Sequence, residues 1–449
     1  MVSVARLPAG GRANWSAVPA PPTAGRRARA STPGGLRRML AWLIVAVLAW
    51  GALAVFTVSQ HASGAGPVVS SSEPLTYDAL GIWQSLSDAN DEASAAILAG
   101  SEPPQAIVAR YGHDLDVARG DIVDAASRGG PAASLSALST GLDSYQDVVS
   151  RALANNQLGF PVGAGYLRQA SALMTLTLLP LAHDLYTTEE ARLAATSAQA
   201  TGLPLVAVTI VAGLALGVAY WQSNRWIYRR TRRVLNAGLL LAGAAGAVVM
   251  VWLVVAFLSG RADLLAAQTQ GSTPVEALAS ADIAVLKAHS YEALTLINNS
   301  GDDSNEAAFE AQRTALGPGP GSLLTSAQQA AAGSPGAAAA AAAPAAAVAW
   351  FAQHQIVRAD DDGDNARVAG GGTHQQAVSV VVSGPAGKAF DVLSADLSEA
   401  VSADNTAFAA HASSGQAPFT ALEPGVVVAT LIMVAAVGWG LSRRLAEYR

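Results

Sequence analysis

The sequence contains no cysteine in its 449 residues. Disulfide bonds and thiolate metal sites are therefore excluded, so any domain outside the cytoplasm must be stable through packing alone. Lysine is scarce as well: Lys287 and Lys388 are the only two, and all other Lys/Arg positions are arginine. Together with abundant alanine and glycine, this bias is typical of a GC-rich bacterial genome.

Ionisable residues are missing from four apolar runs that divide the chain. Each run is close to the roughly 20 residues that a helix needs to cross the hydrocarbon core of a bilayer. The sequence therefore predicts an all-α membrane protein with four transmembrane helices. Because ion and substrate pathways usually place ionisable groups within the bilayer, transport through these helices is not expected. The four runs are residues 39–58, 203–221, 234–258 and 424–441.

The distribution of arginine predicts the topology. Residues 1–38 contain seven arginines and no acid, residues 222–233 contain five arginines, and residues 442–449 contain three arginines and one acid. Residues 59–202 and 259–423 hold 32 of the 33 acidic residues. By the positive-inside rule, both terminal tails and the short loop are cytoplasmic, and the two long segments form extracytoplasmic domains.

The amino-terminal part has two alternative interpretations. A cleaved signal peptide has an apolar core of about 7 to 15 residues. The first run is longer, so a retained anchor is expected, although Ala52-Leu53-Ala54 resembles a cleavage site. The basic tail could instead bind nucleic acid, but arginines scattered among Pro, Gly, Ala and Ser are typical of a disordered tail beside anionic lipid. We expect contact with the lipid bilayer and no nucleic acid partner.

Both long segments are expected to be helical bundles, and their apolar patterns repeat. Five positions in each segment are spaced by 3, 4, 3 and 4 residues, which places them along one face of a helix. We name these two faces the seams. They consist of Trp83, Leu86, Asn90, Ala93 and Ile97 in the first segment, and of Ile283, Leu286, Ser290, Ala293 and Ile297 in the second.

Identical residues around the seams predict an internal duplication. Leu86, Glu92, Ala93 and Ile97 each recur 200 residues later in the chain. Each unit would then be one membrane helix leading out, a helical bundle and one membrane helix leading back. The alternative is a chance match between two alanine-rich amphipathic helices.

Local signals divide the first long segment. Residues 155–165, with Pro161 between glycines, are expected to be a loop, and Pro180 is expected to kink the apolar helix that follows. Before this loop, a helix is expected to begin after Pro131. The residues on its apolar face are Leu142, Tyr145, Val148, Val149 and Leu153.

The second long segment is expected to be broken differently. Residues 317–320 and 333–336, both rich in Gly and Pro, should bracket a flexible connection. The alanine-rich residues 337–347 should be helical only as far as Pro344, with a new helix from about Trp350. The remaining expectations are an acidic loop at residues 360–364, a β-branched run at residues 377–382 and a closing helix at residues 390–410.

No catalytic constellation is present in the sequence, and we expect neither an enzyme nor a cofactor. Glu92 and Glu292 could act as an acid and a base, but carboxylates beside a helical seam are more often solvated or ion-paired. One group of potential metal ligands has no metal-binding spacing and is expected to be a solvated acidic loop, so no metal site is predicted. This group is His354, Asp360, Asp361, Asp362 and His374.

Small residues in the membrane runs predict close helix contacts. Gly213 and Gly217 form a Gly-x-x-x-Gly pair, and Gly238, Ala242 and Gly246 form a stripe with the same period. Such spacing lets the backbones of two helices approach closely in a bilayer.

A docking surface for a cytoplasmic partner is predicted in the short loop between the second and third membrane helices. Arginine and aromatic residues are enriched in protein interfaces. The alternative is that these aromatic residues are membrane anchors and the arginines are topology signals. The residues are Arg225, Trp226, Tyr228, Arg229 and Arg230.

The alternation of membrane helices and exterior helical bundles resembles the sensory halves of bacterial chemoreceptors and sensor kinases. Those proteins carry a cytoplasmic output domain, which a loop and a tail as short as residues 222–233 and 442–449 cannot form. The chain also resembles the actinobacterial four-pass protein that couples an extracytoplasmic glutamine/aspartate-binding lipoprotein to a cytoplasmic serine/threonine kinase. That resemblance lies in the topology and in the stretch Pro161-Val162-Gly163-Ala164-Gly165-Tyr166-Leu167-Arg168 with Leu178-Leu179-Pro180.

The first functional hypothesis is therefore a transmembrane signal-coupling protein. The resemblance implies an extracytoplasmic solute-binding protein and a cytoplasmic kinase or other effector as partners, and a homo-oligomer is a further possibility. The alternative is a cell-envelope or division scaffold, or a permease-like regulatory subunit that works with an ATPase. An enzyme is also considered, and it ranks third because no pattern of residues supports it.

Overall fold

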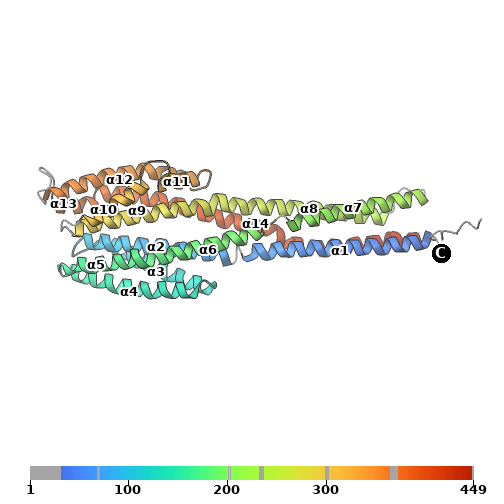
Figure 1. Cartoon of the computed structure of the whole chain (residues 1–449), viewed down its shortest axis with the longest axis horizontal. Coiled ribbons are helices and arrows are strands. Elements are labelled where there is room, and N and C mark those ends of the chain that lie inside the picture. Colours follow the sequence, from blue (N-terminus) through green and yellow to red (C-terminus); the bar gives the residue numbers. More distant parts are fainter. Residues whose placement is uncertain are drawn as a thin grey trace, which may run out of the picture.

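The computed structural model of the protein describes residues 32–67, 71–200, 202, 204–231, 237–298, 303–364 and 373–446. Every secondary-structure element in these residues is helical, which confirms the all-α prediction (Figure 1). The first elements are α1 Thr32–Pro67, α2 Glu73–Leu98, α3 Gln105–Ser127, α4 Ala132–Gln157, α5 Val162–Leu173, the π-helical η2 Met174–Leu178, α6 Leu179–Ala200 and α7 Pro204–Thr231. The others are α8 Ala237–Ala267, the π-helical η3 Gln268–Ser272, α9 Thr273–Asn298, α10 Ser304–Leu316, α11 Leu323–Ala330, α12 Ala337–Asp364, α13 His374–Val382 and α14 Pro385–Ala446.

The helices form a long rod with two parts (Figure 1). One part consists of α1, α7, α8 and the second half of α14, and we name it the membrane bundle. The other part consists of α2 to α6, α9 to α13 and the first half of α14, and we name it the head. The start of α1, the end of α7, the start of α8 and the end of α14 all lie at the end of the rod far from the head.

Four helical stretches are long and apolar enough to cross a membrane, which confirms the predicted number of membrane helices. They are Arg37–Ser63, Pro204–Arg229, Ala237–Asn298 and His374–Arg443. The third stretch is 62 residues long, or about 90 Å of helix, whereas a bilayer core measures about 30 Å. The uncharged residues 237–258 and 424–441 are therefore the candidate membrane-spanning parts of the last two stretches, and both stretches extend from there into the head.

Small residues allow the closest helix contacts in the membrane bundle, as the sequence predicted. A Cβ atom on Gly238 would lie 2.4 Å from Cα of Gly440, so α8 and α14 touch through their backbones. Gly246 of α8 faces Met433 of α14. Ala242, which lies between Gly238 and Gly246 in the stripe, is fully buried. The prediction of a close contact at the Gly213 and Gly217 pair is correct for Gly213 only. Gly213 faces Trp50 and Met250, but a Cβ on Gly217 would meet no described atom within 4 Å.

The two predicted seams are buried and pack against each other in the centre of the head. Trp83 and Leu86 of α2 and Ile283 and Leu286 of α9 are at most 6% exposed. The amide of Asn90 donates to Oγ of Ser290 at 3.2 Å, and these two residues occupy the same position in their seams, 200 residues apart. The seam assignment is therefore confirmed. The duplication itself stays a prediction.

In the first half of the head, α4 follows the prediction but the next loop is shorter than expected. Leu142, Tyr145 and Val149 of α4 are buried. The helix continues to Gln157 and α5 begins at Val162, so the chain turns within four residues, where Gly159 adopts a φ of +72°. Only a glycine adopts this conformation without strain.

Pro180 does not break the helix in which it lies. The π-helical η2 directly precedes α6, and Pro180 is the second residue of α6. A π turn widens the helix locally and re-routes its hydrogen bonds. We infer that this turn accommodates the missing N–H of the proline.

Two predicted irregular regions in the second half of the head are helices. The expected flexible connection contains α11, where Ser322 accepts a hydrogen bond from the N–H of Thr325 at the helix start. The alanine-rich residues belong to α12, which runs through Pro344 without interruption. Buried Ala340 and Ala347 on either side of Pro344 show why. Tertiary packing of the alanine face outweighs the local cost of proline.

The predicted acidic loop is wrong and the β-branched run is helical, whereas the closing helix at residues 390–410 is confirmed as part of a longer helix. Residues 360–364 form the last turn of α12, where Asp361 is 4% exposed and accepts from Nη1 of Arg358 at 3.0 Å. Residues 377–382 are helical in α13, which starts with a capping box of Thr373 and Gln376. The closing helix is part of α14, which continues into the membrane bundle through Pro418 and Pro424.

Candidate functional site

A cavity of about 540 Å³ lies in the head where the two long segments meet. It is walled by α2 and α3 from the first segment and by α9, α13 and α14 from the second. Its volume falls within the range of about 300 to 1,000 Å³ that is usual for small-molecule sites. We therefore take this cavity as the candidate ligand site.

The cavity has one acidic wall and one apolar wall. The apolar wall includes Leu98, Ile107, Ala293, Val381 and Val382. The charged residues that line the cavity comprise five carboxylates and two basic groups, so negative charge is in excess when all are ionised. They are Asp88, Asp91, Glu92, Asp114, Asp391, Arg110 and His289.

Asp91 and His289 link the two halves of the head at the floor of the cavity. Nδ1 of His289 lies 2.8 Å from Oδ1 of Asp91, and Oγ of Ser290 donates to the same carboxylate at 3.3 Å. The imidazole stacks on Phe390 of α14, with 3.8 Å between the ring centroids and 10° between the planes. One side chain therefore contacts α2 and α14 from its position on α9.

The second imidazole nitrogen of His289, Nε2, makes no hydrogen bond with the described residues. The side chain is 8% exposed. Burial lowers the pKa of His289, but the adjacent Asp91 carboxylate outweighs this effect and raises the pKa to about 9. The imidazole is therefore protonated near neutral pH, and its unused Nε2–H can donate to a ligand.

The carboxylates of the cavity hold protons more tightly than usual. Burial raises the pKa of Asp88 well above its ordinary range, and the nearby Asp282 and Asp114 raise it further. Burial also raises the pKa of Glu92 to about 7, although its hydrogen bond with Arg110 lowers it. The pKa of Asp114 is raised to about 6 by burial. A group of buried carboxylates with too few cations behaves in this way.

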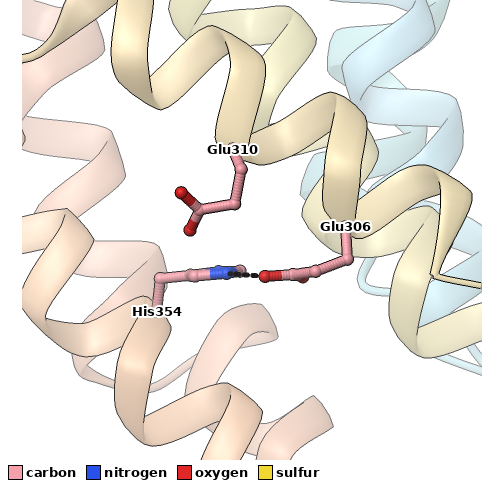
Figure 2. Close-up of side chains that lie close together, drawn as sticks. All are labelled: Glu306, Glu310 and His354. Atoms are coloured by element: carbon pink, nitrogen blue, oxygen red, sulfur yellow. Dashed lines mark hydrogen bonds and ion pairs between the residues drawn. The ribbon is translucent and has the colours of Figure 1, made fainter.

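A second polar cluster lies between α9, α10 and α12 and contains potential metal ligands. His354, Glu306 and Glu310 present ligand atoms within 4.8 Å of one another (Figure 2). Nδ1 of the buried His354 lies 2.7 Å from Oε1 of Glu292, and its Nε2 lies 3.2 Å from Oε1 of Glu306.

Arginines already neutralise the carboxylates of this second cluster. Nε of Arg358 lies 3.3 Å from Oε2 of Glu306, and Nε of Arg313 donates to Glu310 at 2.6 Å. Burial lowers the pKa of His354, but hydrogen bonds with its two glutamate partners outweigh burial and raise the pKa to about 9. A metal would have to displace this proton. We read the cluster as an ion-pair network that joins three helices.

The structure separates the predicted group of acidic and histidine residues. His354 belongs to the network just described, whereas Nδ1 of His374 lies 2.7 Å from Oδ1 of Asp361. Glu92 and Glu292 do not face each other, because Glu92 pairs with Arg110 and Glu292 pairs with His354. The ion-paired interpretation of these two glutamates is therefore correct.

The predicted docking residues lie at the end of α7 and not in a loop. Residues 222–231 are helical, because no proline or glycine stops the helix before Thr231. Trp226 is partly buried beside Gly35 of α1, and the guanidinium of Arg225 lies 5.4 Å from the ring centroid of Trp221.

The other three docking residues are less enclosed in the structure. Tyr228 is 49% exposed and Arg229 is exposed. The side chain of Arg230 lies outside the described residues. Docking at this end of α7 stays a prediction.

Sequence reasoning missed the cavity, although one signal was present. Asp91 and Glu92 follow Asp88 by three and four residues, so all three lie on one helix face beside the first seam. His289 is 198 residues away from its partner Asp91. No local pattern could bring these residues together.

Comparison with known proteins supports a sensing role. Residues 64–198 match a family model described as "Actinobacterial sensor domain". No curated protein and no solved structure matches the chain. The matched residues include α2 and α3, which carry the acidic wall of the cavity. The protein is thus a helical membrane protein in which residues 64–198 are similar to actinobacterial sensor domains.

Proposed function

We propose that this protein is a transmembrane signal-coupling protein. It binds an extracytoplasmic ligand in the cavity of the head and passes a displacement to a separate cytoplasmic partner. One observation carries this proposal: two walls of the cavity belong to helices that continue into the membrane bundle. α9 joins α8 through η3 without a break, and α14 is a single helix from Pro385 to Ala446.

These two continuous helices are packed against each other between the cavity and the membrane. A Cβ on Gly271 of η3 would lie 2.5 Å from Cβ of Phe408 on α14. Gly260 of α8 is similarly close to Phe419. A ligand that changes the spacing of α9 and α14 at the cavity therefore favours a shift of their membrane parts. Shifts of about 1 to 2 Å between packed helices are a common means of signalling.

The finer parts of the proposal concern sidedness and partners. The arginine-rich ends of α1, α7 and α14 would be cytoplasmic and the head extracytoplasmic. A solute-binding protein would contact the head, and a kinase or other effector would dock at Arg225, Tyr228 and Arg229 at the end of α7. The protein would act by binding, and not as an enzyme.

Cysteine crosslinking tests the coupling, because the chain has no cysteine of its own. We would place one pair at Gly246 and Met433, which joins α8 to α14, and a second pair at Gly51 and Thr430, which joins α1 to α14. The crosslinking rates would be measured in native membranes with and without the substitution His289→Ala in the cavity.

We expect His289→Ala to change at least one of the two rates about threefold or more, because it removes the side-chain contacts of α9 with Asp91 of α2 and Phe390 of α14. The control substitution is Asp143→Asn at an exposed position of α4, which should leave both rates unchanged. Equal rates in wild type and in the His289→Ala variant at both pairs would refute the coupling.

A further inference from the structure

We propose that the cavity of the head binds a small organic amine that also carries an oxygen acceptor. The ammonium group would lie among the carboxylates of Asp88, Asp91 and Glu92, and the oxygen would accept a hydrogen bond from Nε2 of His289. This inference deepens the proposed function, since it names the class of ligand that the sensor site takes.

The carboxylates of the cavity favour a cation over an anion, because a nearby positive charge stabilises their ionised forms and offsets the effect of burial on their pKa values. Five carboxylates line the cavity, against Arg110 and His289 as basic groups. Buried carboxylates without matching cations are costly, and their repulsion disfavours any further negative charge. An ammonium group supplies one positive charge and three N–H donors, which suits several carboxylate oxygens at once.

His289 supplies an observation that is independent of the acidic residues. Its Nδ1 is bound to Asp91 and its ring is fixed by stacking on Phe390, so Nε2 is held in place. Within the described chain this nitrogen has no partner, and its residue lines the cavity. Because buried polar atoms are nearly always satisfied, a ligand oxygen is the natural partner for this N–H.

The size and the apolar wall of the cavity favour an organic cation over a metal ion. A space of about 540 Å³ is much larger than a single ion requires, and Leu98, Ile107 and Val381 line part of it. Two of the carboxylates are already engaged by protein donors, Asp91 by His289 and Glu92 by Arg110. A carbon skeleton would pack against the apolar wall while its ammonium group meets the carboxylates.

Calorimetric titration of the purified full-length protein in lipid nanodiscs tests the proposal with a matched series of probes. 5-Amino-1-pentanol carries an ammonium group and a hydroxyl, pentylamine carries only the ammonium group, and 1,5-pentanediol carries no charge. We expect the amino alcohol to bind most tightly, pentylamine to bind more weakly, and the diol to give no heat of binding. Calcium chloride is the probe for a metal site.

Two cavity variants and one control complete the test. Asp88→Asn and Glu92→Gln should each weaken binding of the amino alcohol about tenfold or more, since a hydrogen bond to a charged group is lost. Asp143→Asn makes the same chemical change on the exposed face of α4 and should leave binding unchanged. Thermal melting would establish that each variant is folded, and both should fold because each removes charge from a crowded acidic site.

Several results would overturn the amine assignment. These are diol binding as tight as that of the amino alcohol, a response to calcium alone, or unchanged affinity in folded Asp88→Asn protein. Amine binding that leaves crosslinking unchanged at both cysteine pairs would refute only the coupling. Crosslinking that responds to His289→Ala without amine binding would refute only the ligand class.

Discussion

Among single residues, the buried charges of the head are concentrated at contacts between its two halves or between successive helices. Asp91 and His289 join α2 to α9, and both side chains are less than 10% exposed. His354 is fully buried between Glu292 and Glu306. Buried pairs of this kind contribute little net stability, but breaking one of them leaves an unpaired charge in the interior. We infer that they fix how the helices sit against one another.

The two buried histidines predict how stability depends on pH. The pKa of His354 is raised to about 9 from an ordinary 6.5. A folded pKa above the unfolded value gives stability that is complete below about pH 6.5 and is lost as pH rises through 9. The contribution of His354 is on the order of 3 kcal/mol. His289 acts in the same direction, because its pKa is also about 9.

We therefore expect the melting temperature of the purified protein to fall between pH 7 and pH 9.5. Glu92 and Asp282, whose pKa values are raised to about 7, reduce stability as pH rises from about 4 to 7, so they add little to the change above pH 8. The double variant Glu292→Gln, His354→Gln should show a smaller fall, since of the two histidines only His289 still titrates in this window. A melting temperature that stays constant or rises over this window would show that these histidines are not protonated in the folded state.

At the residue scale the sequence predicted roles better than partners. It indicated that Glu92 and Glu292 are solvated or ion-paired, because both lie beside an apolar seam, and the structure shows the ion-paired case. It could not name Arg110 and His354 as their partners, since the connecting helices determine those contacts. Asp361 was expected to be solvated but is buried, because Arg358 on its own helix and His374 of α13 both contact its carboxylate.

At the scale of helices, the seams of α2 and α9 form the central contact of the head. Both are apolar except for one polar layer, where Asn90 meets Ser290 and Asp91 meets His289. A polar layer in an apolar contact fixes the register of two helices, because any shift would leave these groups unpaired.

The substitutions Leu86→Asp and Leu286→Asp test the seams. Each leucine is at most 2% exposed, so each aspartate would be a buried, unpaired charge. We expect each to reduce the free energy of unfolding by roughly 3 to 5 kcal/mol. Val123→Asp on α3 is the control, because Val123 is 66% exposed.

Thermal melting and limited proteolysis of the head would measure these effects. Similar losses in the two leucine variants would support the duplication, in which the two positions are equivalent. If both variants resist protease as the wild type does, the seams are not the core of the head, and the main support for the duplication disappears.

Helix boundaries were predicted less well than helix faces. The 3.6-residue period identified the buried faces of α2, α4 and α9, because burial of an apolar stripe is what a helix pattern records. Pro180 was expected to mark a kink and Pro344 a helix end, yet both lie within continuous helical stretches. Tertiary packing outweighs the local free-energy cost of a proline in a helix, and a local sequence pattern does not reveal the packing energy.

At the scale of the whole molecule, a single long helix joins the cavity to the membrane bundle. The cavity lies in the head, and α14 alone spans 62 residues from the cavity wall to the far end of the membrane bundle. The apolar runs and the arginine pattern were sufficient to predict this four-helix plan, since the bilayer imposes both. The cavity was not predictable, because it is formed by helices that come from both halves of the chain.

The last prediction concerns the orientation of this rod in the membrane. The arginine-rich ends of α1, α7 and α14 lie together, far from the head, so a single orientation satisfies the positive-inside rule at all of them. Because the chain has no cysteine, single serine-to-cysteine substitutions can report the side of each position. Ser101→Cys and Ser383→Cys lie in exposed turns of the head, and Ser442→Cys is exposed near the end of α14.

A membrane-impermeant maleimide applied to intact cells should label Ser101→Cys and Ser383→Cys, and should label Ser442→Cys only after the membrane is opened. Cysteine-free wild-type protein is the control for background labelling. Labelling of Ser442→Cys in intact cells, with protection of both head positions, would place the head in the cytoplasm. The cavity could not then sense an extracytoplasmic ligand, and the proposed direction of signalling would be reversed.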